Sequence, residues 1–312
     1  MKAAVRAPGR GRGIKGLLVN RQLYLMLLIP LALLFVFKYA PMYGAQIAFR
    51  NYRPTAGFLG SQWVGFKYFT RFFNSPLFGK LMGNTLLLSL ESLILSFPLP
   101  ILLAFALTYV RSGRYGKVVQ MVSYAPHFIS VVVMVGILVQ LFNVQYGVLN
   151  QALKALGFGS VDVLGKAQFF RGTYVLSGIW QNCGWNSIIY ISALAAVDPQ
   201  IHEACVVDGA TKLQRIRYVD FPSILPTAVT LFILSFGSFM SNGFEKVYLL
   251  QNDLNLSVSE VIDTYVYKMG LSSASANFSY STAIGLFQSL ISFCLVVLVN
   301  RVSKAAVGES LW

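Results

Sequence analysis

One short stretch of the sequence brings acidic and basic residues together. It runs from Asp198 to Pro222, reads DPQIHEACVVDGATKLQRIRYVDFP, and holds four carboxylates and three basic side chains. The chain on both sides is nearly uncharged and rich in Leu, Ile, Val and Phe. Charges gathered in this way form either a solvated loop or a surface that pairs with another protein. The elements around the stretch decide between these two interpretations.

The other residues that could take part in chemistry stand alone in the sequence. Glu91 is the only acid inside a long apolar segment, and we favour a structural pair or a position lining a pathway over a proton carrier. His127 is interpreted as a polar residue in a helix kink. A membrane enzyme would need paired acids, or a nucleophile with its base, and these two residues do not make such a set. No metal site or disulfide framework is indicated by the three widely spaced cysteines, Cys183, Cys205 and Cys294.

The composition indicates a membrane protein. Charged residues make up 12% of the 312 residues and hydrophobic residues 56%, whereas roughly a quarter of a soluble chain is charged. The net charge is +14, but Lys and Arg are scattered between apolar runs rather than gathered in one domain. We therefore interpret them as topology signals and lipid contacts, and expect no nucleic-acid partner.

The apolar segments predict an all-α integral membrane protein with six transmembrane helices. A helix needs about 20 mainly apolar residues to cross the hydrocarbon core. Six segments qualify: Leu23–Tyr43, Thr85–Val110, Val118–Phe142, Tyr174–Val197, Ile224–Phe244 and Thr282–Val302. The fourth is the weakest, because it contains Gln181, Asn182, Asn186 and Ser187. Bends or local unwinding are expected at Pro30, Pro98, Pro100 and Pro126.

The basic N-terminal tail sets the topology. Residues 1–21 carry six basic side chains and no acid, which places this tail in the cytoplasm. Six spans then put the C-terminal tail, 303–312, on the same side. Residues 22–84 comprise the first span and an outer loop, whose many aromatic residues predict a helix at the membrane interface. Residues 85–302 form the core, and the polar loop at 198–222 is cytoplasmic.

The polar loop itself predicts a short helix, a break and a second helix. Pro199 is a helix start signal, and Glu203 is expected in the first helical turn, where a negative charge suits the helix dipole. Gly209 permits a sharp reversal. A second helix is expected over 211–221, ended by Pro222 and Pro226 before the fifth span.

At this point the residues carry a family resemblance. Glu203-Ala204-Cys205, two further residues, Asp208-Gly209-Ala210 and the later Pro222 resemble the EAA loop of permease subunits in ABC importers; Cys205 replaces the usual second Ala. The outer motifs YAPMYGAQIAFRNY, WVGFKYFTRFF, LMGNTLLLS, VIDTYVYKMGL and the terminal ESLW are similar to the LplB-like group of oligosaccharide permeases. The resemblance implies the type I ABC importer permease fold in the bacterial inner membrane.

The resemblance also implies a role for the loop as a coupling helix that docks in a groove of an ATPase subunit. Glu203 would pair with a basic ATPase residue, Ala204, Cys205 and Ala210 would allow close packing, and Gly209 would make the turn. The remaining members of the predicted docking set are Asp208, Lys212 and Arg215. The chain has no G-x-x-x-x-G-K-[ST] phosphate loop, so it is expected to bind no cofactor and to leave ATP and Mg to partner subunits.

The implied partners are a second, homologous permease subunit, two ATPase subunits and a periplasmic or lipid-anchored solute-binding protein. The expected substrate is a neutral or acidic oligosaccharide, and basic outer loops make uronate oligomers one candidate. The residues expected to line its pathway are Asn182, Trp185, Asn186, Tyr190, Phe239 and Asn242. Their rings and amides suit polyols, although helix-to-helix hydrogen bonding explains the amides equally well.

A second hypothesis is an ion-coupled secondary carrier for a small polar solute. It predicts repeated halves and several intramembrane acids, and neither is found in the sequence. The leading hypothesis stays a permease subunit that is itself non-catalytic, because the sequence has no phosphate loop.

Overall fold

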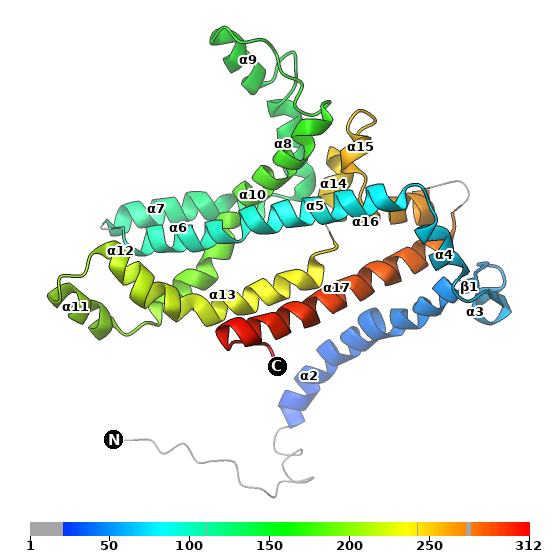
Figure 1. Cartoon of the computed structure of the whole chain (residues 1–312), viewed down its shortest axis with the longest axis horizontal. Coiled ribbons are helices and arrows are strands. Elements are labelled where there is room, and N and C mark those ends of the chain that lie inside the picture. Colours follow the sequence, from blue (N-terminus) through cyan, green and yellow to red (C-terminus); the bar gives the residue numbers. More distant parts are fainter. Residues whose placement is uncertain (1–20, 111, 242, 273–275) are drawn as a thin grey trace, which may run out of the picture.

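Long helices make up most of the chain (Figure 1). The structure is a computed structural model that describes residues 21–110, 112–241, 243–272 and 276–312. The basic tail up to residue 20 and the pathway candidate Asn242 lie outside the described residues. The polar loop and the short β-hairpin lie at opposite ends of the bundle in Figure 1.

The first helix runs from Arg21 to Phe49 through α2 (Arg21–Leu34), η1 (Phe35–Tyr39) and η2 (Ala40–Phe49). Pro30 lies inside α2, and the helix continues past it. Any bend at Pro30 therefore leaves the helix unbroken. No residue of α2 or η1 is buried. A helix that is apolar on all sides and unburied suits contact with lipid or with another membrane subunit.

A compact aromatic segment follows the first helix. Strand β1 (Arg50–Asn51) pairs antiparallel with β2 (Gln62–Trp63), with α3 (Gly57–Gly60) between them. The helix expected in this outer loop is present as α4 (Lys67–Phe73). Its Tyr68 and Phe72 are buried in the core cluster that includes residues of α17, whereas Phe66, just before the helix, remains exposed. Only part of the aromatic surface is therefore available to a membrane interface.

The second apolar segment is one helix of 31 residues, Phe78–Thr108, made of α5 (Phe78–Ser96) and α6 (Pro98–Thr108). Phe97 keeps helical angles (φ −72°, ψ −46°) and donates its backbone N–H to Leu93 O. The deviation expected at Pro98 and Pro100 is limited to Phe97, where α5 passes into α6 without ending the helical run. Both prolines lie in the first turn of α6, where a missing N–H is best tolerated.

The third segment is broken, as Pro126 predicted. Helix α7 (Gly113–Tyr124) passes into η3 (Ala125–Phe128), and α8 (Val131–Leu141) then leaves at an angle of 102°. Helix α9 (Val148–Ala155) follows at the tip of the arm seen in Figure 1. Ser130 caps α8 by accepting the backbone N–H of Val133.

The fourth segment, α10 (Ala167–Ala195), is the centre of the bundle and contacts α5, α6, α7, α13 and α14. Gly184 permits a close approach to α7, because a Cβ atom added there would overlap the backbone oxygen of Ser123. Its 29 residues span about 43 Å at 1.5 Å per residue, which is long enough to cross a bilayer. Two of the polar side chains that weakened this span in the sequence contact the kink between α7 and α8: Gln181 donates to Ile129 O, and Asn182 Oδ1 lies 3.0 Å from His127 Nδ1. Ser187 donates to Gly184 O within α10.

The fifth segment is a helical run from Lys212 to Ser238: α12 (Lys212–Arg215), η4 (Ile216–Asp220), α13 (Phe221–Ser235) and η5 (Phe236–Ser238). Pro222 and Pro226 do not end a helix before this span, contrary to expectation. Pro222 lies in the first turn of α13, and the preceding π-helical η4 keeps the chain helical. The run stops at Ser238 rather than Phe244, and Gly243 (φ +59°) precedes the next helix.

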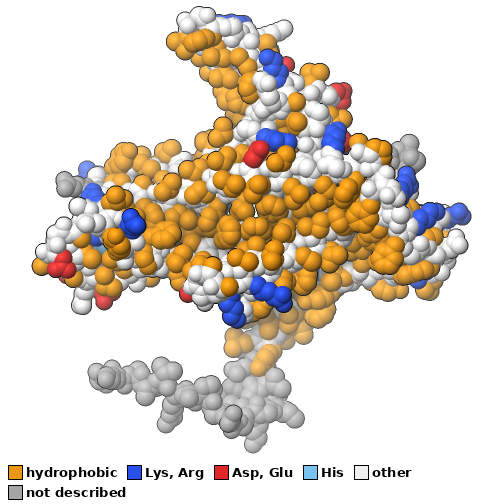
Figure 2. Space-filling view, viewed as in Figure 1, with side chains coloured by type: hydrophobic (Ala, Val, Ile, Leu, Met, Phe, Trp, Pro, Cys, Tyr) orange, Lys and Arg blue, Asp and Glu red, His pale blue; other side chains and the backbone are white. Residues whose placement is uncertain are grey.

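The remaining elements are α11 (Pro199–Val207), α14 (Phe244–Leu250), α15 (Leu256–Ser259), α16 (Ile262–Tyr267), η6 (Lys268–Ser272) and the long α17 (Phe278–Val307). Within the described residues, four helices are long and apolar enough to span a membrane, and the bent α7–α8 pair makes up to five. Helix α10 is long but more polar, so the count of six spans stays a prediction. Figure 2 shows apolar side chains across the middle of the face over α5, α13 and α17.

Candidate functional site

The polar loop folds as a helix, a sharp turn and a second helix. Asp198 caps α11 by accepting the backbone N–H of Gln200 at 2.9 Å, and Pro199 is the first residue of the helix. Gly209 makes the turn with φ +73°. Thr211 and Gln214 form a capping box that starts α12. The predicted arrangement is therefore present, except that Glu203 lies in the second turn of α11 rather than the first.

Most of the predicted docking set faces solvent in this chain. Glu203, Ala204, Asp208, Gly209 and Lys212 are exposed, whereas the side chains of three others are half-buried: Cys205, Ala210 and Arg215. A Cβ atom added at Gly209 would meet no atom within 4 Å. The turn thus presents an open surface to a partner.

Two apolar residues of this surface were missed by the sequence analysis. Val207 is 87% exposed and Leu213 is 74% exposed, and they flank the turn at Gly209. The sequence contained a signal for this surface, because these two apolar residues stand directly beside the charged residues of the motif. Exposed apolar side chains rimmed by charges are typical of protein interaction sites.

A buried carboxylate anchors the loop to the bundle. Asp220 of η4 is fully buried, and its Oδ2 accepts the hydroxyl of Tyr109 at 2.6 Å. His202 of α11 brings Nε2 to 3.3 Å from Asp220 Oδ1. The Arg215 guanidinium lies 5.2 Å from the centre of the Tyr109 ring, so it turns toward the bundle as well as the surface. These contacts join the loop to the end of α6.

One face of α10 lines a polar cavity. Tyr174, Gly178, Asn182 and Asn186 recur every four residues, which places them in one row along the helix. The cavity holds about 600 Å³. Its other walls include Ser92 and Ser96 of α5, Gln181 of α10, and Phe244, Glu245 and Lys246 of α14.

A second, serine-rich cavity of about 240 Å³ adjoins the first, since both are lined by Ser92, Ser96, Tyr174 and Gly243. It adds four serines and the predicted pathway residue Phe239. Hydroxyl, amide and aromatic groups therefore line a connected hollow between α5, α10 and the residues that follow α13. Such groups bind the hydroxyls and apolar faces of sugars.

The structure separates the predicted pathway residues into three groups. Asn182, Asn186 and Phe239 line the cavities. Trp185 stacks on His127 with ring centres 4.5 Å apart, and His127 Nδ1 lies 3.0 Å from Asn182 Oδ1. Tyr190 is 3% exposed and packs in an apolar cluster, so its predicted place in the pathway is not supported.

His127 and Glu91 both have structural partners. His127 lies in the kink after Pro126, as interpreted from the sequence, and is held by Trp185 and Asn182. Glu91 Oε1 lies 3.5 Å from Arg171 Nη1, which links α5 to α10. Both residues therefore have contacts of the kind that a structural role requires.

Lys246 is the cavity residue that the sequence analysis missed. Its side chain is buried, and Nζ donates to Tyr174 O at 2.6 Å while lying 4.5 Å from the centre of the Tyr174 ring. Helix α14 is too short to span a membrane. Burial lowers the pKa of the Lys246 ammonium to about 8, because desolvation disfavours the charged form.

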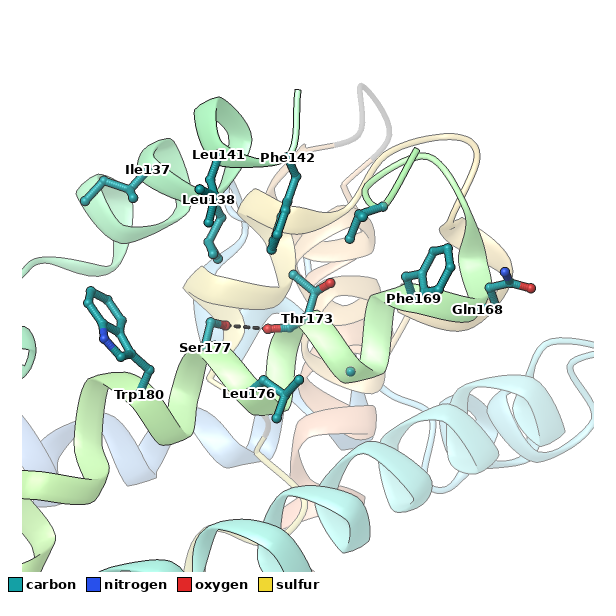
Figure 3. A pocket seen from close by; sticks show the side chains of 12 residues that line it. Ile137, Leu138, Leu141, Phe142, Gln168, Phe169, Thr173, Leu176, Ser177 and Trp180 are labelled. Carbon is teal, nitrogen blue, oxygen red and sulfur yellow. Dashed lines mark hydrogen bonds between the residues drawn. The ribbon is translucent and has the colours of Figure 1, made fainter. Parts of the chain in front are cut away.

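A third hollow is apolar and of a different kind (Figure 3). It holds about 510 Å³ between α8 and the first half of α10. Ile137, Leu138 and Leu141 come from α8, and Leu176 and Trp180 face them from α10. No charged residue lines it. This groove suits apolar side chains or lipid rather than a polar solute.

Comparison with known proteins decides the family. Residues 96–307 match the family described as "Binding-protein-dependent transport system inner membrane component". The chain belongs to this family. The permease is 40% identical over 97% of its length to Protein LplB of Bacillus subtilis, covering 95% of that protein. It is 42% identical over 97% of its length to YteP of Bacillus subtilis, a polygalacturonan/rhamnogalacturonan transport system permease protein, covering 94% of that protein.

A solved structure agrees with this assignment. The permease superposes on a chain of a bacterial ABC transporter involved in the import of the acidic polysaccharide alginate, with a TM-score of 0.86 and 35% identity. The match covers 94% of the permease and 98% of that chain. The same transporter type is known in complex with an alginate pentasaccharide-bound periplasmic protein, at the same TM-score and identity. The type I ABC permease fold expected from the sequence is confirmed.

Proposed function

We propose that the permease is the transmembrane subunit of an ATP-driven importer for acidic oligosaccharides. The polar cavity beside α10 carries this proposal, because its amides, hydroxyls and rings suit a sugar and its volume lies in the range of ligand sites. Two relatives support the acidic class, since one transports polygalacturonan or rhamnogalacturonan and the other imports alginate. All three named polymers contain uronate sugars.

Two ATPase subunits would bind ATP and Mg and dock on the loop at 198–222. The open turn at Gly209 and the exposed Val207 and Leu213 support this assignment, because docking would bury them. Closure of the ATPases would then move α11. The contacts of Asp220 would pass that movement to η4, α13 and the end of α6.

The other proposed partners are a second permease subunit and a solute-binding protein. The unburied α2 and the apolar groove between α8 and α10 leave surface that a second permease would cover. A periplasmic or lipid-anchored binding protein would deliver the sugar at the opposite end from the polar loop. Both termini of the permease would then lie in the cytoplasm.

A substrate panel tests this function. The permease is purified with its partner subunits and binding protein, and ATP hydrolysis is measured with galacturonate, mannuronate and guluronate oligomers, neutral maltotetraose and an amino-acid mixture. We expect at least one uronate oligomer to stimulate hydrolysis several-fold and the amino acids to have no effect. Stimulation by amino acids alone, or by neutral sugar alone, would contradict the proposal.

A further inference from the structure

The ammonium of Lys246 lies at the wall of the polar cavity. It contacts the backbone oxygen and ring of Tyr174, and a Cβ atom at Gly178 would lie 3.1 Å from its Nζ. Tyr174 and Gly178 are neighbours in the cavity-lining row of α10, and Asn182 is the next residue of that row. The charge is thus placed beside the groups that would bind a sugar.

No carboxylate forms an ion pair with Lys246 in the described part of the chain. Glu245, the carboxylate that also lines this cavity, is exposed and forms no such pair. The buried acids of the described residues have partners elsewhere: Glu260 pairs with Lys80 and Lys268, and Asp220 lies beside His202. The Lys246 side chain is only 8% exposed. A buried charge with one backbone acceptor is costly unless a counter-charge joins it.

An ammonium has three N–H donors, and one of them is used by Tyr174 O. A carboxylate entering the cavity would accept from the others and neutralise the charge. Neutral sugars would leave the ammonium without a counter-charge, and sites with unpaired buried polar groups discriminate strongly.

We propose that Lys246 binds a carboxylate of the transported sugar and selects for anionic oligosaccharides. This inference rests on the proposed import of acidic oligosaccharides and assigns the selection to one residue of the permease itself. The amides of Asn182 and Asn186 then bind sugar hydroxyls on the same row of α10. The Tyr174 ring and the Ser92 hydroxyl complete the surroundings of the bound unit.

The experiment must measure sugar binding by the permease in the absence of its binding protein, because the binding protein also selects sugars. Equilibrium binding is measured on the purified permease–ATPase complex without its binding protein. The probes are radiolabelled tetragalacturonate and tetramannuronate, each with its carboxyl-reduced neutral counterpart. The variants are Lys246→Met, which removes the charge at similar length, and Lys246→Arg, which retains it. Lys154→Met, an exposed residue of α9, is the matched control.

For at least one uronate, we expect the wild type and Lys154→Met to bind it at least tenfold more tightly than its neutral counterpart. Lys246→Met should lose this preference, and Lys246→Arg should keep part of it. Folding should survive in Lys246→Met, because Met has a similar length and carries no charge whose burial costs free energy. An unchanged midpoint of thermal unfolding in detergent and undiminished co-purification of the ATPases check this.

Three outcomes overturn the inference. In the first, the wild type binds no uronate or does not prefer the uronate to its neutral counterpart. In the second, Lys246→Met keeps this preference. In the third, Lys246→Met loses binding of the uronate and of the neutral counterpart equally. If the substrate panel still shows uronate-stimulated hydrolysis, the proposed function stands and only the role of Lys246 fails. If the panel shows none, the proposed function has failed by itself.

Discussion

Replacing Gly209 by Gln is expected to reduce uptake to less than a tenth of the wild-type rate. Gly209 has φ +73°, where a residue with a Cβ atom costs about 1 kcal/mol or more. The Gln side chain would also project from the turn between the exposed Val207 and Leu213. If this surface docks on an ATPase, the added bulk separates the two proteins. The measurement is uptake together with the amount of ATPase retained on purification.

Gly157→Gln is the matched control for this prediction. Gly157 follows α9 and has φ +83°, with no atom within 4 Å of an added Cβ, as at Gly209. Both variants therefore bear similar backbone strain, but Gly157 belongs to the arm away from the polar loop (Figure 1). Normal uptake in the control and loss in Gly209→Gln would assign the effect to docking. An equal loss of uptake in both variants would show that the effect comes from local backbone strain and not from docking.

Replacing Asp220 by Ala should destabilise the permease by about 2 kcal/mol and weaken coupling between ATP hydrolysis and transport. The carboxylate is fully buried between Tyr109 and His202. Its removal leaves the Tyr109 hydroxyl without its acceptor, and an unsatisfied buried donor is costly. The midpoint of thermal unfolding in detergent and the ratio of sugar transported to ATP hydrolysed are the two measurements.

Two further variants separate the causes of this effect. Asp220→Asn keeps an acceptor of the same shape for the Tyr109 hydroxyl, so we expect a smaller loss of stability. Asp253→Ala removes an exposed carboxylate and should change neither quantity. A normal transport ratio in Asp220→Ala, despite lower stability, would show that the anchor holds the fold without transmitting movement.

The sequence predicted the features that depend on local patterns. Apolar length located the helices, and the spacing from Glu203 to Pro222 located the helix–turn–helix, since both are properties of neighbouring residues. Pro126 predicted the break between α7 and α8. At Pro98 the effect is limited to Phe97, because a proline in the first turn of α6 is compatible with a continuing helix.

The missed features depend on packing between distant segments. Lys246 stands next to an apolar run, and only the contact of α14 with Tyr174 and Gly178 places it at the cavity. Tyr190 shares the helix of Asn182 and Asn186, but it points into an apolar cluster with Ile101 and Ile224. The helices that pack around α10 determine which of its faces lines the cavity. The sequence of α10 alone does not show where those helices pack.

The most direct test of the whole account is uptake into proteoliposomes that contain the permease, its partner permease and the ATPases. Binding protein loaded with a labelled uronate oligomer is supplied outside, and ATP and Mg inside. We expect the oligomer to accumulate above the outside concentration, and we expect this accumulation to require internal ATP and to be lost in Gly209→Gln. Accumulation driven by a proton or sodium gradient without ATP would contradict it.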